Sequence, residues 1–287
     1  MRPTIVLLVA EALGSSPDTV MSAAVAIELV HNFSLIHDDI IDGDDRRRGR
    51  ATVWKALGPN AALLAGDALL TLAFEVLLES DSAVALVAAR HLGRATLEMV
   101  DGEASEGLLC QDRAQMDDCI AIAQRKTGAL FRCACELAGL FGDATQQQCG
   151  HLQVFGERVG LAFQIVDDVL AIWGGPGRTG KPECSDLRNR RLTFPVVAAL
   201  ESGTQAGREL HTAYSREQGS SPTDVWQLAQ LIERAGARAW CEKKAMELID
   251  EGISELRCGL LCDQATIAAI EAVARHPLDL LMSGGRD

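Results

Sequence analysis

Apolar residues recur at every third or fourth position along most of this chain, which is the spacing of one face of an α-helix. The clearest helix start is Ser16-Pro17-Asp18, which combines an N-cap residue, a first-turn proline and an early acid. The helical pattern then runs without a break to Asp42 and stops at Gly43. It predicts one long helix of about 25 residues.

The same periodicity continues to the end of the chain, without strand-like alternation between its segments. Further helices are predicted at 60–78, 82–100, 117–141, 145–173, 193–201, 222–253 and 263–274. The polar, glycine-containing span 202–221 is predicted as a loop or a short helical excursion, and 283–287 as a flexible tail. We therefore expect a single all-α domain over residues 1–287.

Composition supports helices and narrows the class of protein. The chain is 48% hydrophobic with eight prolines and one tyrosine, which favours helices over a sandwich or barrel. Its formal net charge of −13 argues against nucleic acid as a partner. Apolar runs fall short of the roughly 18 uncharged residues of a membrane span, and Glu11 interrupts the apolar N-terminus where a signal peptide would continue. A soluble, cytoplasmic protein is expected, with its nine cysteines as thiols because none forms a C-x-x-C pair.

An aspartate cluster, His37-Asp38-Asp39-Ile40-Ile41-Asp42, ends the long helix. Asp38 and Asp42 are four residues apart on one helical face, while Asp39 points about 100° away. Like charges at this spacing, near the negative end of the helix dipole, destabilise the helix unless a cation binds between them. The structural alternative is a solvated acidic helix end.

Basic residues follow this cluster and precede it. The span 43–50 places four arginines directly after the acids, where they suit bidentate contact with phosphate oxygens or form a self-neutralising surface loop. His31 lies two turns before Asp38 on the same face, either as a further anion contact or as a buried core residue. Further cations occur at Lys126, Lys181 and 188–191.

A second aspartate cluster lies within the predicted helix 145–173. Gln164, Asp167 and Ala171 share one face there, above Gly156 and Gly160, whose small size leaves volume in front of the carboxylate. Two carboxylate walls facing across a cavity would hold Mg²⁺ ions against a diphosphate. The pairing of the two clusters therefore indicates an enzyme.

Five stretches, in this order, resemble the all-trans short-chain prenyl diphosphate synthases (farnesyl and geranylgeranyl diphosphate synthases) of the isoprenoid synthase superfamily: 31–54, 66–77, 126–131, 163–168 and 179–196. The resemblance implies an antiparallel helical bundle around a deep central cavity, usually a homodimer. It also implies a Mg²⁺-dependent prenyltransferase that condenses isopentenyl diphosphate with an allylic diphosphate.

The resemblance assigns roles to individual positions. Three acids would hold three Mg²⁺ ions and two more would support them: Asp38, Asp42 and Asp167, with Asp39 and Asp168. The cations expected to contact the allylic diphosphate are Arg47, Lys126 and Lys181, with Arg191 as a further substrate contact. The residues expected to bind isopentenyl diphosphate are Arg2, His31 and Arg48. The oxygens expected to face the carbocation belong to Thr127 and Gln164.

The chain departs from the family pattern at three places. It is N-terminally short, because the Gly-Gly-Lys-Arg run expected before Arg2-Pro3 is absent, so the isopentenyl site lacks a lysine. Ala171 replaces the third acid of the second motif, for which we expect reduced but not abolished Mg²⁺ binding. Arg191 occupies a position that is usually lysine, which keeps the charge but changes the geometry.

Product length is expected to depend on Phe33 and Ser34, five and four residues before Asp38. One aromatic and one small residue favour geranylgeranyl diphosphate, with farnesyl diphosphate next. Two other functions fit the same scaffold: a terpene cyclase, which needs only one diphosphate site, and a non-catalytic subunit of a heteromeric prenyl synthase. A purely structural helical protein is the remaining alternative.

Overall fold

The computed structural model describes residues 1–79, 83–109, 114–174, 184–215, 222–260 and 264–282. Its elements are α1 (Arg2–Ala12), α2 (Pro17–Ile41), β1 (Arg46–Arg47), β2 (Arg50–Ala51), α3 (Val53–Leu57), α4 (Pro59–Leu78), α5 (Ala85–Glu106), α6 (Met116–Ala123), the π-helical turn η1 (Gln124–Gly128), α7 (Ala129–Phe141), α8 (Gln146–Trp173), α10 (Ser185–Arg188), α11 (Phe194–Glu201), α12 (Gln205–Tyr214), α13 (Pro222–Arg234), α14 (Ala237–Gly259) and α15 (Gln264–Met282). Within these ranges the only strands form one two-residue pair, so the predicted all-α class is confirmed. Lys181 and the predicted tail 283–287 lie outside the described residues.

The predicted long helix is α2, which begins and ends as expected. The Ser16 hydroxyl accepts a hydrogen bond from the amide of Asp18 at 3.4 Å, and Pro17 occupies the first turn. At the other end Asp42 is the C-cap, and Gly43 turns the chain away with φ +67°. Local capping signals therefore fix the position at which the first aspartate cluster leaves the helix.

Other predicted helices differ from the observed ones where tertiary packing intervenes. The predicted helix 117–141 is continuous but carries the π-turn η1 in its middle. The predicted helix 222–253 is divided by Gly236, whose φ of +82° begins a new helix, α14. Helix α1 has no counterpart in the sequence prediction, whereas α12 is the short helical excursion expected within 202–221.

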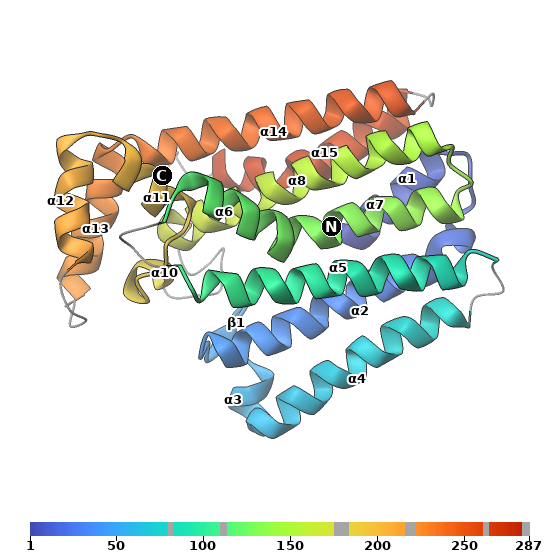
Figure 1. Cartoon of the computed structure of the whole chain (residues 1–287), viewed down its shortest axis with the longest axis horizontal. Coiled ribbons are helices and arrows are strands. Elements are labelled where there is room, and N and C mark those ends of the chain that lie inside the picture. The colour runs from blue at the N-terminus through green and yellow to red at the C-terminus, as the bar shows by residue number, and fades with distance from the viewer. Residues whose placement is uncertain (80–82, 110–113, 175–183, 216–221, 261–263, 283–287) are drawn as a thin grey trace.

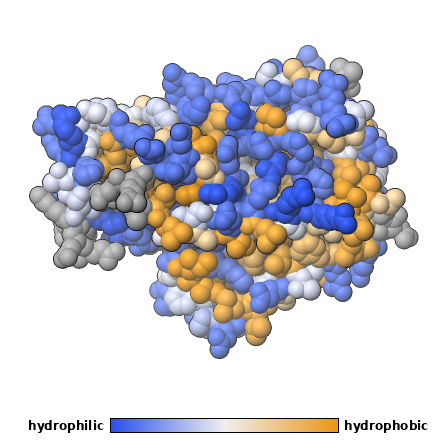
Figure 2. Space-filling view, in the orientation of Figure 1, coloured by the Kyte–Doolittle hydropathy of each residue, from blue (hydrophilic) through white to orange (hydrophobic). Residues whose placement is uncertain are grey.

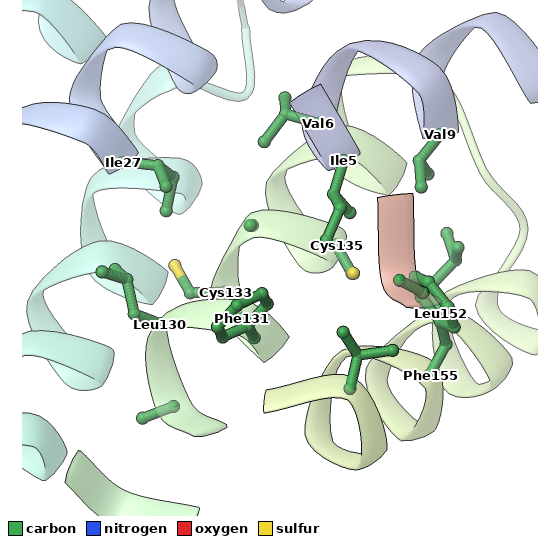
Figure 3. Close-up of a cluster of buried hydrophobic side chains, with 14 of the residues drawn as sticks. Ile5, Val6, Val9, Ile27, Leu130, Phe131, Cys133, Cys135, Leu152 and Phe155 are labelled. Carbon is green, nitrogen blue, oxygen red and sulfur yellow. The ribbon is translucent and has the colours of Figure 1, made fainter. Parts of the chain in front are cut away.

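Long helices pack side by side around one apolar core (Figure 1). Helix α8 packs against α7 and α14, and α2 packs against α4 and α1. Figure 3 shows the middle of this core, where Phe131 and Cys135 of α7 meet Ile5 of α1 and Phe155 of α8. All four of these side chains are fully buried. The helices packed around this core carry the polar side chains of the site described below.

A smaller apolar cluster joins the end of α8 to the helices α10–α13. It is formed by residues such as Ile172, Leu187, Leu210 and Ile232. In Figure 1 the α12–α13 pair stands at one end of the molecule, with α10 beside it. The turn that follows α10 thus lies between this unit and the main bundle.

Two helices, α2 and α4, are long and apolar enough to cross a membrane by length and composition alone. Helix α2 carries Asp38 and Asp39 in its last turn and packs along α4. One or two such helices are weak evidence, so they do not show a membrane span.

Candidate active site

Asp38 and Asp42 lie one turn apart at the end of α2, as predicted. The amide of Asp42 donates to the carbonyl of Asp38 at 2.8 Å, so both carboxylates leave the same side of the helix. Burial, followed by the nearby carboxylates of Glu103 and Asp42, raises the pKa of Asp38 to about 7, against the opposing charge of Lys126. The positive charge of Lys126 therefore does not offset the effects of burial and of the neighbouring carboxylates on Asp38.

The titration of Asp38 predicts a pH dependence of stability in the metal-free protein. The folded state keeps this proton up to a pKa of about 7, whereas the unfolded chain releases it near the ordinary value of 3.8. Stability is therefore expected to fall as pH rises between these two values and then to level off. The Asp38→Asn variant lacks this titration, so its advantage over wild type in urea unfolding should grow across the interval. Urea melts in EDTA at about pH 4.5 and about pH 7.5 measure this difference, and an equal advantage at both would contradict the assignment.

Asp39 lies about 100° around the helix from Asp38 and orients an arginine. The residue is 4% exposed, and its carboxylate accepts a hydrogen bond from Nε of Arg47 at 2.8 Å. Arg47 belongs to the short hairpin of β1 and β2, in which it pairs with Arg50. This ion pair fixes the guanidinium beside the acidic helix end. The role of Asp39 as a supporting metal acid stays a prediction.

Lys126 lies on the π-turn η1 and reaches two glutamates of α5. Its Nζ is 2.6 Å from Oε2 of Glu103 and also contacts Oε2 of Glu106. Burial lowers the pKa of Lys126, but Glu106, Glu103 and Asp38 outweigh burial and raise it above the ordinary value. Gly102 permits this approach, because a Cβ there would stand 2.4 Å from the amide nitrogen of Lys126. Lys126 is therefore held as a charged donor by the two glutamates, and its charge also acts on Asp38.

Thr127 and Gln164 are joined in a hydrogen-bonded chain. The Thr127 hydroxyl donates to Oε1 of Gln164 at 2.5 Å, and Nε2 of Gln164 donates to Oδ1 of Asp168 at 2.8 Å. The amide of Phe194, the first residue of α11, donates to the other oxygen of Asp168 at 3.0 Å. Burial, followed by Asp186, raises the pKa of Asp168, against these two donors. Both oxygens of Asp168 thus have partners within the protein, whereas Asp167, on the same turn, is exposed.

Arg2, at the start of α1, and His31, on α2, form a buried basic cluster. Nη1 of Arg2 lies 3.3 Å from the imidazole nitrogens of His31, and its guanidinium lies 4.3 Å from the centroid of the Phe131 ring. Burial, followed by the charges of Arg2 and Arg48, lowers the pKa of His31 to about 3. A neutral histidine surrounded by arginines is typical of a site prepared for an anion.

Arg191 links the two halves of the site. Its Nη2 contacts Oδ1 of Asp42, and its Nη1 lies 3.6 Å from Oδ1 of Asp186. Its backbone amide also donates to the carbonyl of Asp186 at 2.9 Å. The turn after α10 therefore places a cation against the first aspartate cluster.

The site residues converge from helices far apart in the sequence, and comparison with known proteins identifies their family. The polyprenyl synthetase family model matches residues 1–232. The chain belongs to the polyprenyl synthetase family.

Relatives of this polyprenyl synthetase agree with the family model. The chain is 42% identical over 257 residues to a (2E,6E)-farnesyl diphosphate synthase of Mycobacterium tuberculosis, covering 88% of this chain and 72% of that protein. It is 40% identical over 257 residues to a geranylgeranyl diphosphate synthase of the same species, covering 89% and 73%. The chain is thus an enzyme, a prenyltransferase whose relatives make short-chain prenyl diphosphates.

Solved structures show the same fold. The polyprenyl synthetase of Streptomyces coelicolor A3(2) superposes with a TM-score of 0.88 at 40% identity, over 96% of this chain and 83% of that one. A geranylgeranyl pyrophosphate synthase of Corynebacterium glutamicum, complexed with isoprenyl diphosphate and magnesium, superposes with a TM-score of 0.89 at 26% identity, over 98% and 86%. The isoprenoid synthase fold is therefore confirmed.

The acids of this polyprenyl synthetase suit a hard divalent cation. Among the described residues, no three His, Cys, Asp or Glu side chains are gathered closely enough to hold a metal ion by themselves. Carboxylates such as those of Asp38 and Asp42 are nevertheless the oxygen ligands that Mg²⁺ prefers, and a cation beside Asp38 would relieve the burial cost that raises its pKa. Asp167 presents a further exposed carboxylate from α8.

The sequence prediction missed Glu103 and Glu106, the partners of Lys126. Their spacing of three residues puts them on one face of α5, and Gly102 precedes them. The sequence shows this spacing of the two glutamates, but only the structure shows that Lys126 contacts them.

Proposed function

We propose that this prenyltransferase condenses isopentenyl diphosphate with an allylic diphosphate in a Mg²⁺-dependent reaction that uses three ions. The observation that carries the proposal is the alternation of acids and cations at the end of α2, where Asp38 and Asp42 adjoin Lys126 and Arg191. Such an arrangement suits a diphosphate bound through metal ions and guanidinium groups. The complex of the Corynebacterium enzyme with magnesium and isoprenyl diphosphate supports the same assignment.

Different residues of the site act in the ionisation of the allylic diphosphate and in the attack of isopentenyl diphosphate on the resulting cation. Bound Mg²⁺ supplies charge stabilisation to the departing diphosphate. Lys126 and Arg47 hold oxygens of the same diphosphate, and Lys181 is proposed as a third contact. Thr127 and Gln164 turn hydroxyl and carbonyl oxygens toward the allylic cation that forms, where their negative ends stabilise it. The central cavity that the family resemblance implies would exclude water that would otherwise trap the cation.

The proposed binding site for isopentenyl diphosphate consists of the basic residues Arg2, His31 and Arg48. His31 stays neutral and can donate one N–H, while the arginines supply the charge. A second anion pocket has little use in a terpene cyclase, which needs one diphosphate site. The intact Asp38 and arginine hairpin likewise disfavour a non-catalytic subunit.

The product is proposed to be geranylgeranyl diphosphate, with farnesyl diphosphate as the next candidate. Phe33 packs edge-on against His37 with ring centroids 4.8 Å apart, and His37 in turn lies against Gly66 of α4. The aromatic ring therefore faces α4, and the small Ser34 is left on the line below Asp38. This arrangement favours space for a longer chain.

We also propose that the protein is a homodimer and that it is located in the cytoplasm. Large apolar side chains are exposed on α4 and α5, where Leu64 is 69% and Leu97 is 71% accessible. Figure 2 shows apolar surface over this side of the molecule. An exposed apolar surface of this kind is typical of a subunit interface. The seven cysteines among the described residues are free thiols, as expected in a reducing compartment.

Purified protein with Mg²⁺ and labelled isopentenyl diphosphate tests the proposal directly. We expect label to enter products when dimethylallyl, geranyl or farnesyl diphosphate is added, and product identification gives the chain length. No incorporation with any allylic substrate would refute the synthase. A cyclic hydrocarbon formed from the allylic substrate alone would establish the cyclase instead.

A further inference from the structure

Two non-glycine residues with left-handed backbone flank the short helix α10: Cys184 precedes it, and Arg190 lies in the turn that follows it and carries Arg191. Cys184 has φ +54° and Arg190 has φ +53°. At this φ the Cβ atom crowds the following carbonyl, which costs free energy that glycine avoids. Two such residues on either side of one short helix indicate that contacts elsewhere hold this segment in place.

The side chains of both residues make those contacts. The buried thiol of Cys184 donates to the carbonyl of Ile172, on α8, at 3.4 Å. Nη1 of Arg190 donates to the carbonyl of Ala213 at 2.8 Å, and its guanidinium lies 5.0 Å from the centroid of the Tyr214 ring, at the end of α12. The residue before α10 is thus fixed to the main bundle, and the turn after α10 is fixed to α12 of the α12–α13 pair (Figure 1).

Arg191 follows Arg190 directly and points to the active site. Its guanidinium contacts Asp42 and Asp186, and its amide donates to the carbonyl of Asp186. The backbone between the two arginines is short and its hydrogen bonds are made within the turn. The position of the Arg191 side chain therefore depends on where α12 holds Arg190.

We propose that Arg190 is a positioning residue, which anchors the turn to α12 and thereby holds Arg191 in the diphosphate site. The inference rests on the proposed function, because Arg191 matters here as a diphosphate contact. Arg190 itself faces away from the reacting groups, toward Ala213 and Tyr214. Its substitution should act on diphosphate affinity through Arg191.

Two substitutions separate positioning from a general effect on stability. Arg190→Ala and Arg190→Gly both remove the anchor, but glycine relieves the strain at φ +53° whereas alanine keeps it. The glycine variant should therefore melt at a higher temperature than the alanine variant. Both should bind inorganic pyrophosphate with Mg²⁺ roughly tenfold more weakly than wild type, measured by isothermal titration calorimetry.

A matched control and two references complete the experiment. Tyr214→Phe keeps the ring under Arg190 and removes a hydroxyl that has no hydrogen-bond partner among the described residues, so its pyrophosphate affinity should equal that of wild type. Arg190→Lys keeps one donor for Ala213 and should recover part of the affinity. Arg191→Ala gives the full loss expected when the contact itself is removed.

The outcomes distinguish this inference from the proposed function. If both Arg190 variants bind pyrophosphate as wild type does, or if their losses follow their melting temperatures, Arg190 is not a positioning residue. If wild-type protein fails to bind pyrophosphate with Mg²⁺, the diphosphate site itself is wrong. Equal losses in the alanine and glycine variants, with unequal stabilities and an intact Tyr214→Phe control, support the inference.

Discussion

Replacing Asp38 with alanine is expected to lower turnover by roughly a thousandfold while leaving the helical fold intact, because the proposed function assigns its carboxylate to a metal ion that would stabilise the transition state. Burial, followed by the charge of Glu103, raises the pKa of Asp38 to about 7. Its removal also relieves crowding with Glu103 and Asp42, so the metal-free variant should be no less stable than wild type. Steady-state kinetics with circular dichroism and thermal melts measure both effects.

Asp279→Ala provides the matched control for this experiment. Asp279 is an exposed aspartate on α15 to which no role in the site is assigned, so the same chemical change is made outside the proposed site. Its kinetics and melting temperature should remain close to those of wild type. Near-normal activity of Asp38→Ala would contradict the assignment of Asp38 as a metal ligand. A loss of helicity would show that the substitution acts on the fold and not on catalysis.

Replacing Lys126 with alanine is the second large effect expected. Lys126 neutralises Glu103 and Glu106 and faces Asp38, so its loss leaves three neighbouring carboxylates without this cation. We expect kcat/KM for the allylic substrate to fall by roughly a hundredfold to a thousandfold, because a preorganised donor to the leaving group is lost. Stability should fall by about 2 kcal/mol, the scale for removing one partner of a charged, partly buried pair.

Lys243→Ala is the control for Lys126, because Lys243 is 76% exposed and contacts only Glu247 through a long ion pair among the described residues. Its substitution should change neither activity nor stability measurably. Lowering the pH should restore part of the stability of Lys126→Ala, since protonation removes the repulsion among the acids. A Lys126→Ala enzyme with unchanged KM and kcat would show that the lysine serves only the packing of α5 against η1.

The first aspartate cluster shows how much of the site could be predicted from the sequence. Capping at Ser16 and the break at Gly43 define α2 locally, and helical periodicity alone separates Asp39 from Asp38 and Asp42. These features depend on residues close in sequence, so they survive in the fold. The identity of the partner of Asp39, Nε of Arg47, depends on the hairpin that follows and appears only in the structure.

The π-turn η1 shows what periodicity could not predict. The pattern from 117 to 141 fits an uninterrupted α-helix, but close packing of Gly102 against Lys126 accompanies a widened turn there. This turn presents Lys126 to α5 and Thr127 to Gln164 of α8. No local signal in the sequence specifies which helix a side chain of this turn meets.

Capping, periodicity and charge spacing act over a few residues, so the sequence was enough to predict the helical class, the ends of α2 and the residue types of the site. The tertiary structure decided the pairings: Lys126 with Glu103, Asp168 with the start of α11, and Arg191 with Asp42. These contacts join segments separated by tens of residues. Their formation depends on how the buried faces of α5, α7 and α8 pack together, and that packing is a property of the whole fold.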